Sequence, residues 1–328
     1  MELRQVDPGD DVAVKALVDL SNRLREADSP WRHPLTVREM AGRLRYGWEK
    51  EPTEVFLAYA DGDLVGTGEY ETTKWDNQHL AWLGVEVLPE VRRRGHGSAV
   101  LTALLDRARA EGRTSAGIDG WVSAAADGFA ERHGFVPKTR EVCRWQLPQE
   151  TDRGALAALQ AGAAPYAADY ELVRRFGPSP DDELDALAAM TAAINDAPLD
   201  DLDVEDEVFT AQRVRDYEDA QVQRGYLLHR VFARHRATGE LAGHTVVVVD
   251  GERPQLAEQH DTSVLRAHRG HRLGLLLKAD MLDWLAETQP QVTSIETWNA
   301  ASNDHMIGVN EVLGYRVMGT AVAYQRSL

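Results

Sequence analysis

The sequence of 328 residues has one cysteine, Cys143, and no long apolar run. A single cysteine excludes an internal disulfide and a cysteine-based metal site, and nothing around Cys143 suggests an activated thiol. No stretch approaches the roughly 18 apolar residues of a membrane-spanning helix. The first residues, Met1 to Val6, lack the basic and apolar regions of a secretory signal peptide. We therefore expect a cytoplasmic protein that does not associate with membranes.

An excess of positive charge is also lacking, since the net charge is −17. Nucleic-acid-binding proteins concentrate basic residues to neutralise phosphates, so we expect no nucleic-acid partner. Acidic residues gather in 181–183 and 196–207. Such segments attract a cationic amine by long-range steering, although most are simply solvated surface. His268 and His271 have no carboxylate or cysteine at zinc-site spacing, so we expect no metal.

The most informative segment is Arg92 to Gly97, with the sequence Arg-Arg-Arg-Gly-His-Gly. It follows a strand-like stretch and opens a helical pattern. Backbone N–H groups at such a turn, together with the helix dipole, suit a diphosphate. The spacing differs from both the Walker loop and the dinucleotide fingerprint.

An altered copy of this turn occurs at Arg269 to Gly274, with Arg272 in place of the first glycine. The length suits two domains of about 150 residues each. Both halves can be read with the same order of elements, which indicates a tandem duplication. We expect domains at 1–148 and 169–328, joined by a linker at 149–168 whose middle can be helical.

Periodicity and turn residues predict the elements of each half. In the first half we expect strands at 3–6, 55–59, 64–72, 79–87, 116–122 and 142–147, and helices at 12–25, 37–46, 99–110 and 125–133. In the second half we expect strands at 171–176, 227–233, 241–249, 257–264 and 292–297, and helices at 183–194, 210–223, 275–287 and 303–313. Thr36 and Glu39 form a plausible capping box.

A strand, an Arg-x-x-Gly-x-Gly turn, a helix, another strand and a short helix ending in Gly134-Phe135 together resemble the GNAT (Gcn5-related) N-acetyltransferase family. The tandem arrangement is similar to mycothiol synthase and related actinobacterial enzymes. Residues 268–278, followed by Asn299, Asn303, Met306, Asn310 and Gly314-Tyr315, look like members of that tandem group.

The resemblance implies an α/β (α+β) fold of two tandem GNAT-like domains, each a mixed, mostly antiparallel twisted sheet flanked by helices. It implies an acyltransferase in which the amine of a small molecule attacks the thioester of acetyl-CoA directly. The co-substrate would be acetyl-CoA, with no metal. Whether the protein is a monomer or a homodimer is not predicted.

By resemblance, the first turn binds the diphosphate and pantetheine arm of acyl-CoA, and the strand before it pairs with the pantetheine amides. The matching residues are Val85, Val87, Arg92, Arg93, Arg94, Gly95, His96, Gly97 and Ser98. In the second copy they are Arg269, Gly270, Gly274 and Asn303, while Arg272 either crowds the phosphates or binds them. We favour the first domain for acyl-CoA and leave a second site open.

Catalysis requires a base for the amine, and often an acid for the thiolate. Family members often place a tyrosine four residues before the Gly-Phe glycine, where this chain has Ala130 and Asn310. Candidate bases are Glu86, His79 and Asp261, and strand alternation leaves open whether Glu86 faces the cleft. The loop at 31–33 lines the acceptor pocket in this family, unless Trp31 packs in the core.

Two alternatives remain to the small-molecule N-acetyltransferase. The missing tyrosine in both halves is compatible with a non-catalytic acyl-CoA-binding or sensor protein. A protein N-acetyltransferase is the other alternative.

Overall fold

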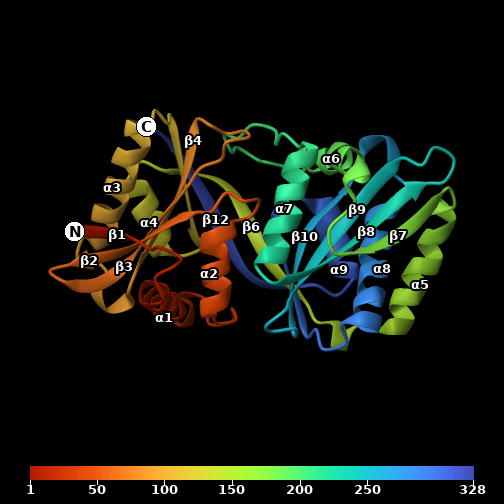
Figure 1. The fold of residues 1–328 in the computed structure, drawn as a ribbon, viewed down its shortest axis with the longest axis horizontal. Coiled ribbons are helices and arrows are strands. Elements are labelled where there is room, and N and C mark those ends of the chain that lie inside the picture. The colour runs from red at the N-terminus through yellow and green to blue at the C-terminus, as the bar shows by residue number, and fades with distance from the viewer. The chain divides into compact units, whose positions relative to one another are not determined.

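The computed structural model describes residues 1–328, and the chain divides into two compact units. Unit 1 comprises 1–141, 199–206 and 319–328, and unit 2 comprises 142–198 and 207–318 (Figure 1). No helix is both long and apolar enough to cross a membrane. No three His, Cys, Asp or Glu side chains lie together in a way that could hold a metal ion.

Unit 1 is a sheet with the strand order β1-β2-β3-β4-β5-β12, flanked by helices. Strands β4 and β5 are parallel, and the other neighbouring pairs are antiparallel. Its elements are β1 (Glu2–Gln5), α1 (Asp11–Asp28), α2 (Val37–Tyr46), β2 (Glu54–Ala60), β3 (Asp63–Glu71), β4 (Leu80–Val87), α3 (His96–Ala110), β5 (Ser115–Trp121), α4 (Ala124–Arg132), the start of β6 (Val136–Gln146) and most of β12 (Arg316–Ser327).

Unit 2 repeats this plan with the strand order β6-β11-β10-β9-β8-β7, and β10 and β11 are its parallel pair. Besides the end of β6, its elements are α5 (Arg153–Ala163), β7 (Tyr170–Phe176), α6 (Leu184–Thr191), α7 (Ala211–Gln223), β8 (Tyr226–His235), β9 (Leu241–Asp250), β10 (Leu256–Val264), α8 (Leu273–Thr288), β11 (Ser294–Ala300) and α9 (Asp304–Val312). The predicted tandem of mixed, mostly antiparallel sheets is confirmed.

The two units exchange their last strands, so they do not follow the chain order of the expected ranges 1–148 and 169–328. Residues 321–327 of β12 pair antiparallel with β5 of unit 1, and the end of β6 belongs to unit 2. The pattern predicted a strand only from 142 and none at 316–327. An unpaired edge on β5 would leave a row of backbone groups unsatisfied. The local pattern therefore neither predicted this strand nor showed which sheet edge it joins.

The helix cap and the hairpin turn that local sequence predicted are present in the structure. The Thr36 side chain accepts from Glu39 N, and the Glu39 side chain accepts from Thr36 N, which is the predicted capping box. Asp61 and Gly62, both with positive φ, make the two-residue turn between β2 and β3. The middle of the expected linker is helix α5.

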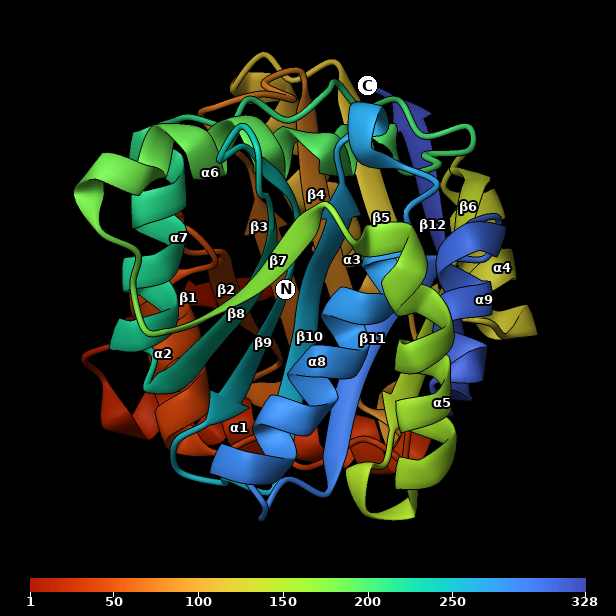
Figure 2. The same ribbon diagram turned by 90° about the vertical axis from the view of Figure 1, so that its right-hand side faces the viewer.

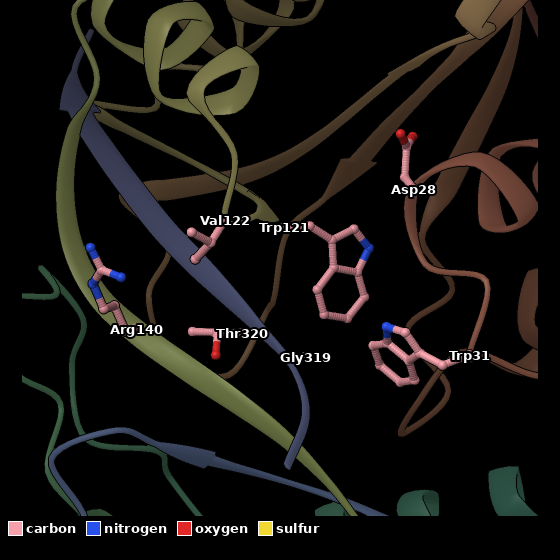
Figure 3. Close-up of a pocket in the computed structure, with 7 residues that line it drawn as sticks. All are labelled: Asp28, Trp31, Trp121, Val122, Arg140, Gly319 and Thr320. Carbon is pink, nitrogen blue, oxygen red and sulfur yellow. The ribbon is translucent and has the colours of Figure 1, made fainter.

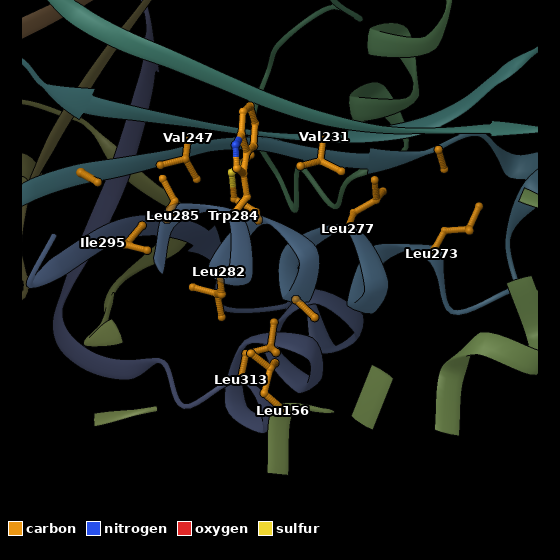
Figure 4. Packing of buried hydrophobic residues seen from close by; sticks show 14 of the residues in the cluster. Leu156, Val231, Val247, Leu273, Leu277, Leu282, Trp284, Leu285, Ile295 and Leu313 are labelled. Carbon is orange, nitrogen blue, oxygen red and sulfur yellow. The ribbon is translucent and has the colours of Figure 1, made fainter. Parts of the chain in front are cut away.

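Each sheet packs against the helix that follows its glycine-bearing turn. In unit 1 the buried side chains of α3 include Val100, Leu101 and Leu104. In unit 2, α8 contributes Leu277 and Trp284 to the larger core (Figure 4). The core therefore fixes the start of each helix at the end of β4 or β10.

A lysine interrupts the second core. Lys278 of α8 is 2% exposed, and its Nζ donates to Asn310 Oδ1 at 2.7 Å. The same Nζ lies 4.3 Å from the centre of the Tyr315 ring. Burial lowers the pKa of Lys278 to about 7. In the first copy the corresponding core residue is Leu101.

This lysine predicts a specific dependence of stability on pH. Above about pH 7 the folded protein holds Lys278 neutral, whereas the unfolded chain keeps it protonated up to the ordinary lysine pKa of 10.5. The unfolded state then binds more protons, so stability rises with pH, by up to about 1.4 kcal/mol per pH unit for this group. We expect wild type to gain stability relative to Lys278→Met between pH 7 and 9 in urea unfolding. Replacing the exposed Lys15 by Met is the control, and parallel curves for wild type and Lys278→Met would refute the assignment.

Candidate functional site

Strands β4 and β5 separate at one end and leave an opening between them. Their parallel pairing covers only Leu80–Leu83 with Ser115–Ile118. Leu88 N donates to Val65 O of β3 at 2.9 Å. Because hydrogen-bonded pairs alternate along an antiparallel ladder, Val85 and Val87 turn their backbone groups away from β3, toward the opening. An extended amide-bearing arm can pair with such an edge.

The first cradle, residues 92–98, follows β4 after a short 3-10 helix at Pro89–Val91. Gly95 precedes α3 with φ 90°, and no side chain caps this helix. A Cβ placed on Gly95 would meet nothing within 4 Å, so the space in front of the helix is open. The first N–H groups of α3, at His96, Gly97 and Ser98, are therefore uncapped by side chains. This arrangement fits the diphosphate of an acyl-CoA.

The three arginines of this cradle have different roles. Arg92 holds Asp28 through two contacts of 2.9 and 2.5 Å, and its Nε donates to Val87 O at 2.8 Å. Arg94 donates to Glu90 O at 3.2 Å. Arg93 is exposed and forms no ion pair. Arg92 thus fixes the turn to β4 and α1, and Arg93 and Arg94 are the cradle arginines that form no ion pair.

Helix α4 closes one side of the first cradle. Ser98 Oγ lies 2.9 Å from Nε2 of His133, which follows α4. Desolvation lowers the pKa of His133, with Arg132 and Arg326 adding to the effect. A Cβ on Gly97 would come within 3.3 Å of Phe129 Cε2. Any larger residue at position 97 would therefore press on α4.

The second cradle, residues 269–275, has the same backbone course as the first. The two left-handed positions are Gly270 and Arg272 in the second copy, with φ 86° and 56°, and Arg93 and Gly95 in the first, with φ 63° and 90°. Glycine and arginine have thus exchanged places. Arg269 repeats the role of Arg92, because it donates to Asp196 Oδ2 at 2.6 Å and to Val264 O at 3.1 Å.

The linker contacts the second cradle directly. His271 Nδ1 lies 2.8 Å from Tyr166 O, and Arg272 Nη1 donates to Gly162 O at 3.3 Å. The Arg272 guanidinium also lies 4.0 Å from the centre of the Tyr166 ring. Helix α5, which leads into this segment, runs beside α8 (Figure 2). Two cradle side chains are therefore engaged by residues 162–166.

The remaining cofactor candidates of unit 2 have structural partners. Asn303 Oδ1 accepts from Met306 N at 3.2 Å and so caps α9, as Ser123 caps α4. Gly274 lies in the first turn of α8. Asn310, at the position of the missing tyrosine, is fully buried between Lys278 and Asn299.

Glu86 faces the opening between β4 and β5. Trp82 lies beside Gly117 in the parallel register, so Glu86, four residues on, is level with Trp121 across the opening and on the same face. No hydrogen bond or ion pair holds the Glu86 carboxylate. Although its side chain is exposed, desolvation by the surrounding protein raises its pKa to about 7, and Glu69 adds to the shift. Arg25 and Arg43 oppose it.

Other carboxylates share this face of the sheet. Glu69 is paired with Arg43 of α2, and Asp119 accepts from Trp82 Nε1 at 2.9 Å. Desolvation raises the pKa of Asp119 and of Glu71, and Glu69 contributes to both shifts. Three carboxylates therefore gather on this face beside Glu86, and Arg25 and Arg43 act on Glu86 with the opposite sign.

The other two base candidates lie elsewhere. His79 precedes β4, and its Nε2 is 3.6 Å from Asp203 Oδ2. Seven residues of extended strand, about 23 Å, separate it from Glu86. Asp261 belongs to unit 2 and lies in the irregularity of β10 between Gln259 and Thr262. Burial raises the pKa of Asp261, against the opposing charge of His260 and then Arg230.

A pocket of about 380 Å³ opens beside Trp121 in unit 1 (Figure 3). The ring centres of Trp31 and Trp121 are 5.1 Å apart, with an angle of 78° between the rings. A Cβ on Gly319 would lie 2.6 Å from Trp31 Cζ2, so the glycine makes room for the indoles. The lining residues are Asp28, Trp31, Trp121, Val122, Arg140, Gly319 and Thr320.

Sequence reasoning had singled out Trp31 but missed the other pocket residues. Trp121, Arg140 and Gly319 come from β5, β6 and β12, which are far apart in the chain. The exchange of β12 brings Gly319 to the indoles, and no local pattern encodes that exchange. Asp28 had no signal either, because its partner Arg92 lies on another element.

Comparisons with known proteins agree with this architecture. The model of the acetyltransferase (GNAT) family matches residues 17–135 and 194–315. A tandem GNAT protein from the clavulanic acid biosynthesis pathway, solved without AcCoA, is 27% identical with a TM-score of 0.81, covering 99% of this chain and 98% of that one. A GCN5-related N-acetyltransferase from Sphaerobacter thermophilus is 15% identical with a TM-score of 0.66, covering 99% and 95%. No curated protein matches the chain.

The family match extends over most of the chain and falls once on each half. Both matched regions contain the strand, the glycine-bearing turn and the helix from which the cradles are built. The chain therefore belongs to the GNAT acetyltransferase family, as a member with two tandem GNAT domains.

Proposed function

We propose that this protein transfers an acetyl group from acetyl-CoA to an amine of a small molecule, and that unit 1 carries the reaction. One observation carries the proposal. Glu86, whose pKa is raised to about 7, is level with the pocket residue Trp121 across the opening between β4 and β5, and an open cradle follows β4. The arm of acetyl-CoA would enter between the donor cradle and the acceptor pocket.

The residues of unit 1 supply the parts of the reaction. The amine nitrogen attacks the thioester carbonyl carbon, and Glu86 takes the proton that the nitrogen loses. The backbone N–H of Val87, turned toward the opening, would donate to the developing oxyanion. When the tetrahedral intermediate collapses, the carbon–sulfur bond breaks and CoA leaves as a thiolate. A thiol with a pKa of about 8.5 leaves without an acid, so Ala130 is compatible with turnover.

The linker supports the assignment of acetyl-CoA to the first cradle. A diphosphate at the second cradle would have to displace the contacts of Tyr166 and Gly162 with His271 and Arg272. It would also meet a side chain at Arg272 where the first cradle has open space at Gly95. We therefore expect each chain to bind one molecule of acetyl-CoA.

A non-catalytic acyl-CoA-binding protein is the second candidate, because neither half has the family's tyrosine. The two are separated by measuring release of the CoA thiol and the mass of acetylated product with a panel of small amines and lysine peptides. Calorimetry with acetyl-CoA accompanies the assay. Acetylation of small amines supports the proposal, acetylation of peptides alone favours a protein acceptor, and binding without turnover favours the sensor.

A further inference from the structure

We infer that the acceptor carries an anionic group as well as its amine, and that Arg140 binds this group in the pocket beside Trp121. The inference rests on the proposed function, because it names the class of acceptor. It comes from the distribution of charge around one cavity.

Arg140 is an exposed side chain of β6 and forms no ion pair or hydrogen bond within the protein. The pocket lining has one carboxylate, Asp28, and Arg92 already holds it through two contacts. Figure 3 shows Arg140 and Thr320 across the pocket from Trp31. This end of the pocket therefore has a guanidinium whose fork of donors suits a carboxylate or phosphate.

On the other side of the opening, the side chains are acidic and favour a cationic group. Glu69 raises the pKa of both Glu86 and Asp119, and Asp119 also raises that of Glu86. Of these three carboxylates, Glu69 is the one held by an arginine. An ammonium group entering beside them would relieve this repulsion. The face of the sheet that joins the two ends therefore favours a positive group at Glu86 and a negative group at Arg140.

The walls between these ends are indoles. Trp31 and Trp121 meet edge to face and give the pocket an aromatic wall, with the Arg32 guanidinium 5.9 Å from the centre of the Trp121 ring. A polyamine would place a second cation next to Arg140, and a simple alkylamine would leave its guanidinium unused. The acceptor class that matches the carboxylates, the indoles and Arg140 together is an amphoteric amine, with an apolar or aromatic body between its amine and its acid.

Two matched probes test this class. Benzylamine and para-(aminomethyl)benzoate share the ring and the amine, and only the second has a distal carboxylate. Binding is measured by calorimetry with CoA present, and turnover by thiol release with acetyl-CoA. A charged hydrogen-bonded pair predicts a preference of about tenfold or more for the carboxylate probe. Arg140→Gln is expected to lose this preference by binding the carboxylate probe more weakly.

Arg109→Gln is the matched control, since it removes an exposed arginine from α3, which packs on the other face of the sheet. Equal affinity of wild type for both probes, or an undiminished preference in Arg140→Gln, would overturn the inference. A preference in binding without turnover would uphold it and count against the proposed reaction. Turnover of both probes without a preference would uphold the proposed reaction and count against the inference. If the protein neither binds nor acetylates either probe, both the reaction and the inference are contradicted.

Discussion

Replacing Glu86 by glutamine is expected to lower kcat/KM for the amine by about 10²- to 10⁴-fold, the usual contribution of a general base. Glutamine keeps the size of the side chain but takes no proton from the attacking nitrogen. Affinity for acetyl-CoA, measured by calorimetry, is expected to stay within about twofold, because Glu86 lies on the acceptor side of the opening. A variant with near-normal kcat/KM would show that Glu86 is only a solvated surface residue.

The dependence of activity on pH is a second test of Glu86 as the general base. The base acts in its deprotonated form, and the pKa of Glu86 is about 7. Activity on a fixed fraction of free amine should therefore be low below pH 7 and rise through that value. Glu69 raises this pKa and Arg43 lowers it, so Glu69→Gln should move the midpoint to lower pH. A midpoint that stays in place in Glu69→Gln would assign the titration to another group.

Gly95→Arg is the second variant with a large expected effect, and it should abolish measurable binding of acetyl-CoA to the whole chain. Arg272 already holds the corresponding left-handed backbone at φ 56°, so an arginine is compatible with this turn. The new side chain would occupy the open space that the diphosphate requires. Wild type should bind one acetyl-CoA per chain in calorimetry.

Two further variants complete this test. Gly112→Arg places an arginine at another open, left-handed glycine, at the end of α3, and should bind acetyl-CoA normally. Arg272→Gly alone should keep a stoichiometry of one, because His271 still contacts Tyr166 O. A second equivalent in Arg272→Gly, or normal binding in Gly95→Arg, would show that the cradles are assigned the wrong way round.

Elements with strong local signals were predictable from the sequence. The capping box at Thr36 and Glu39, the hairpin turn at Asp61 and Gly62, and helix α2 at Val37–Tyr46 depend on neighbouring residues only. The duplicated turn was visible for the same reason. Strand β12 and the start of β6 were missed, because the pairing that makes them strands involves residues distant in the chain.

The candidate site was less predictable than the fold. Arg92 was expected to bind phosphate, but its guanidinium is held by Asp28 and Val87 O. His79 and Glu86 were equal candidates on one strand until the register placed only Glu86 level with Trp121. Alternation gives relative faces along one strand, whereas the neighbour across an opening depends on how two strands separate.

By itself the sequence determined that the chain has two GNAT-like halves and that each has a turn shaped for a diphosphate. These properties are local, since they rest on glycine, helix starts and hydrophobic period. Only the tertiary structure decided that Gly162 and Tyr166 of the linker contact the second cradle, and that Arg140 and Gly319 line a pocket beside Trp121. These contacts join residues far apart in the chain, and packing alone brings them together.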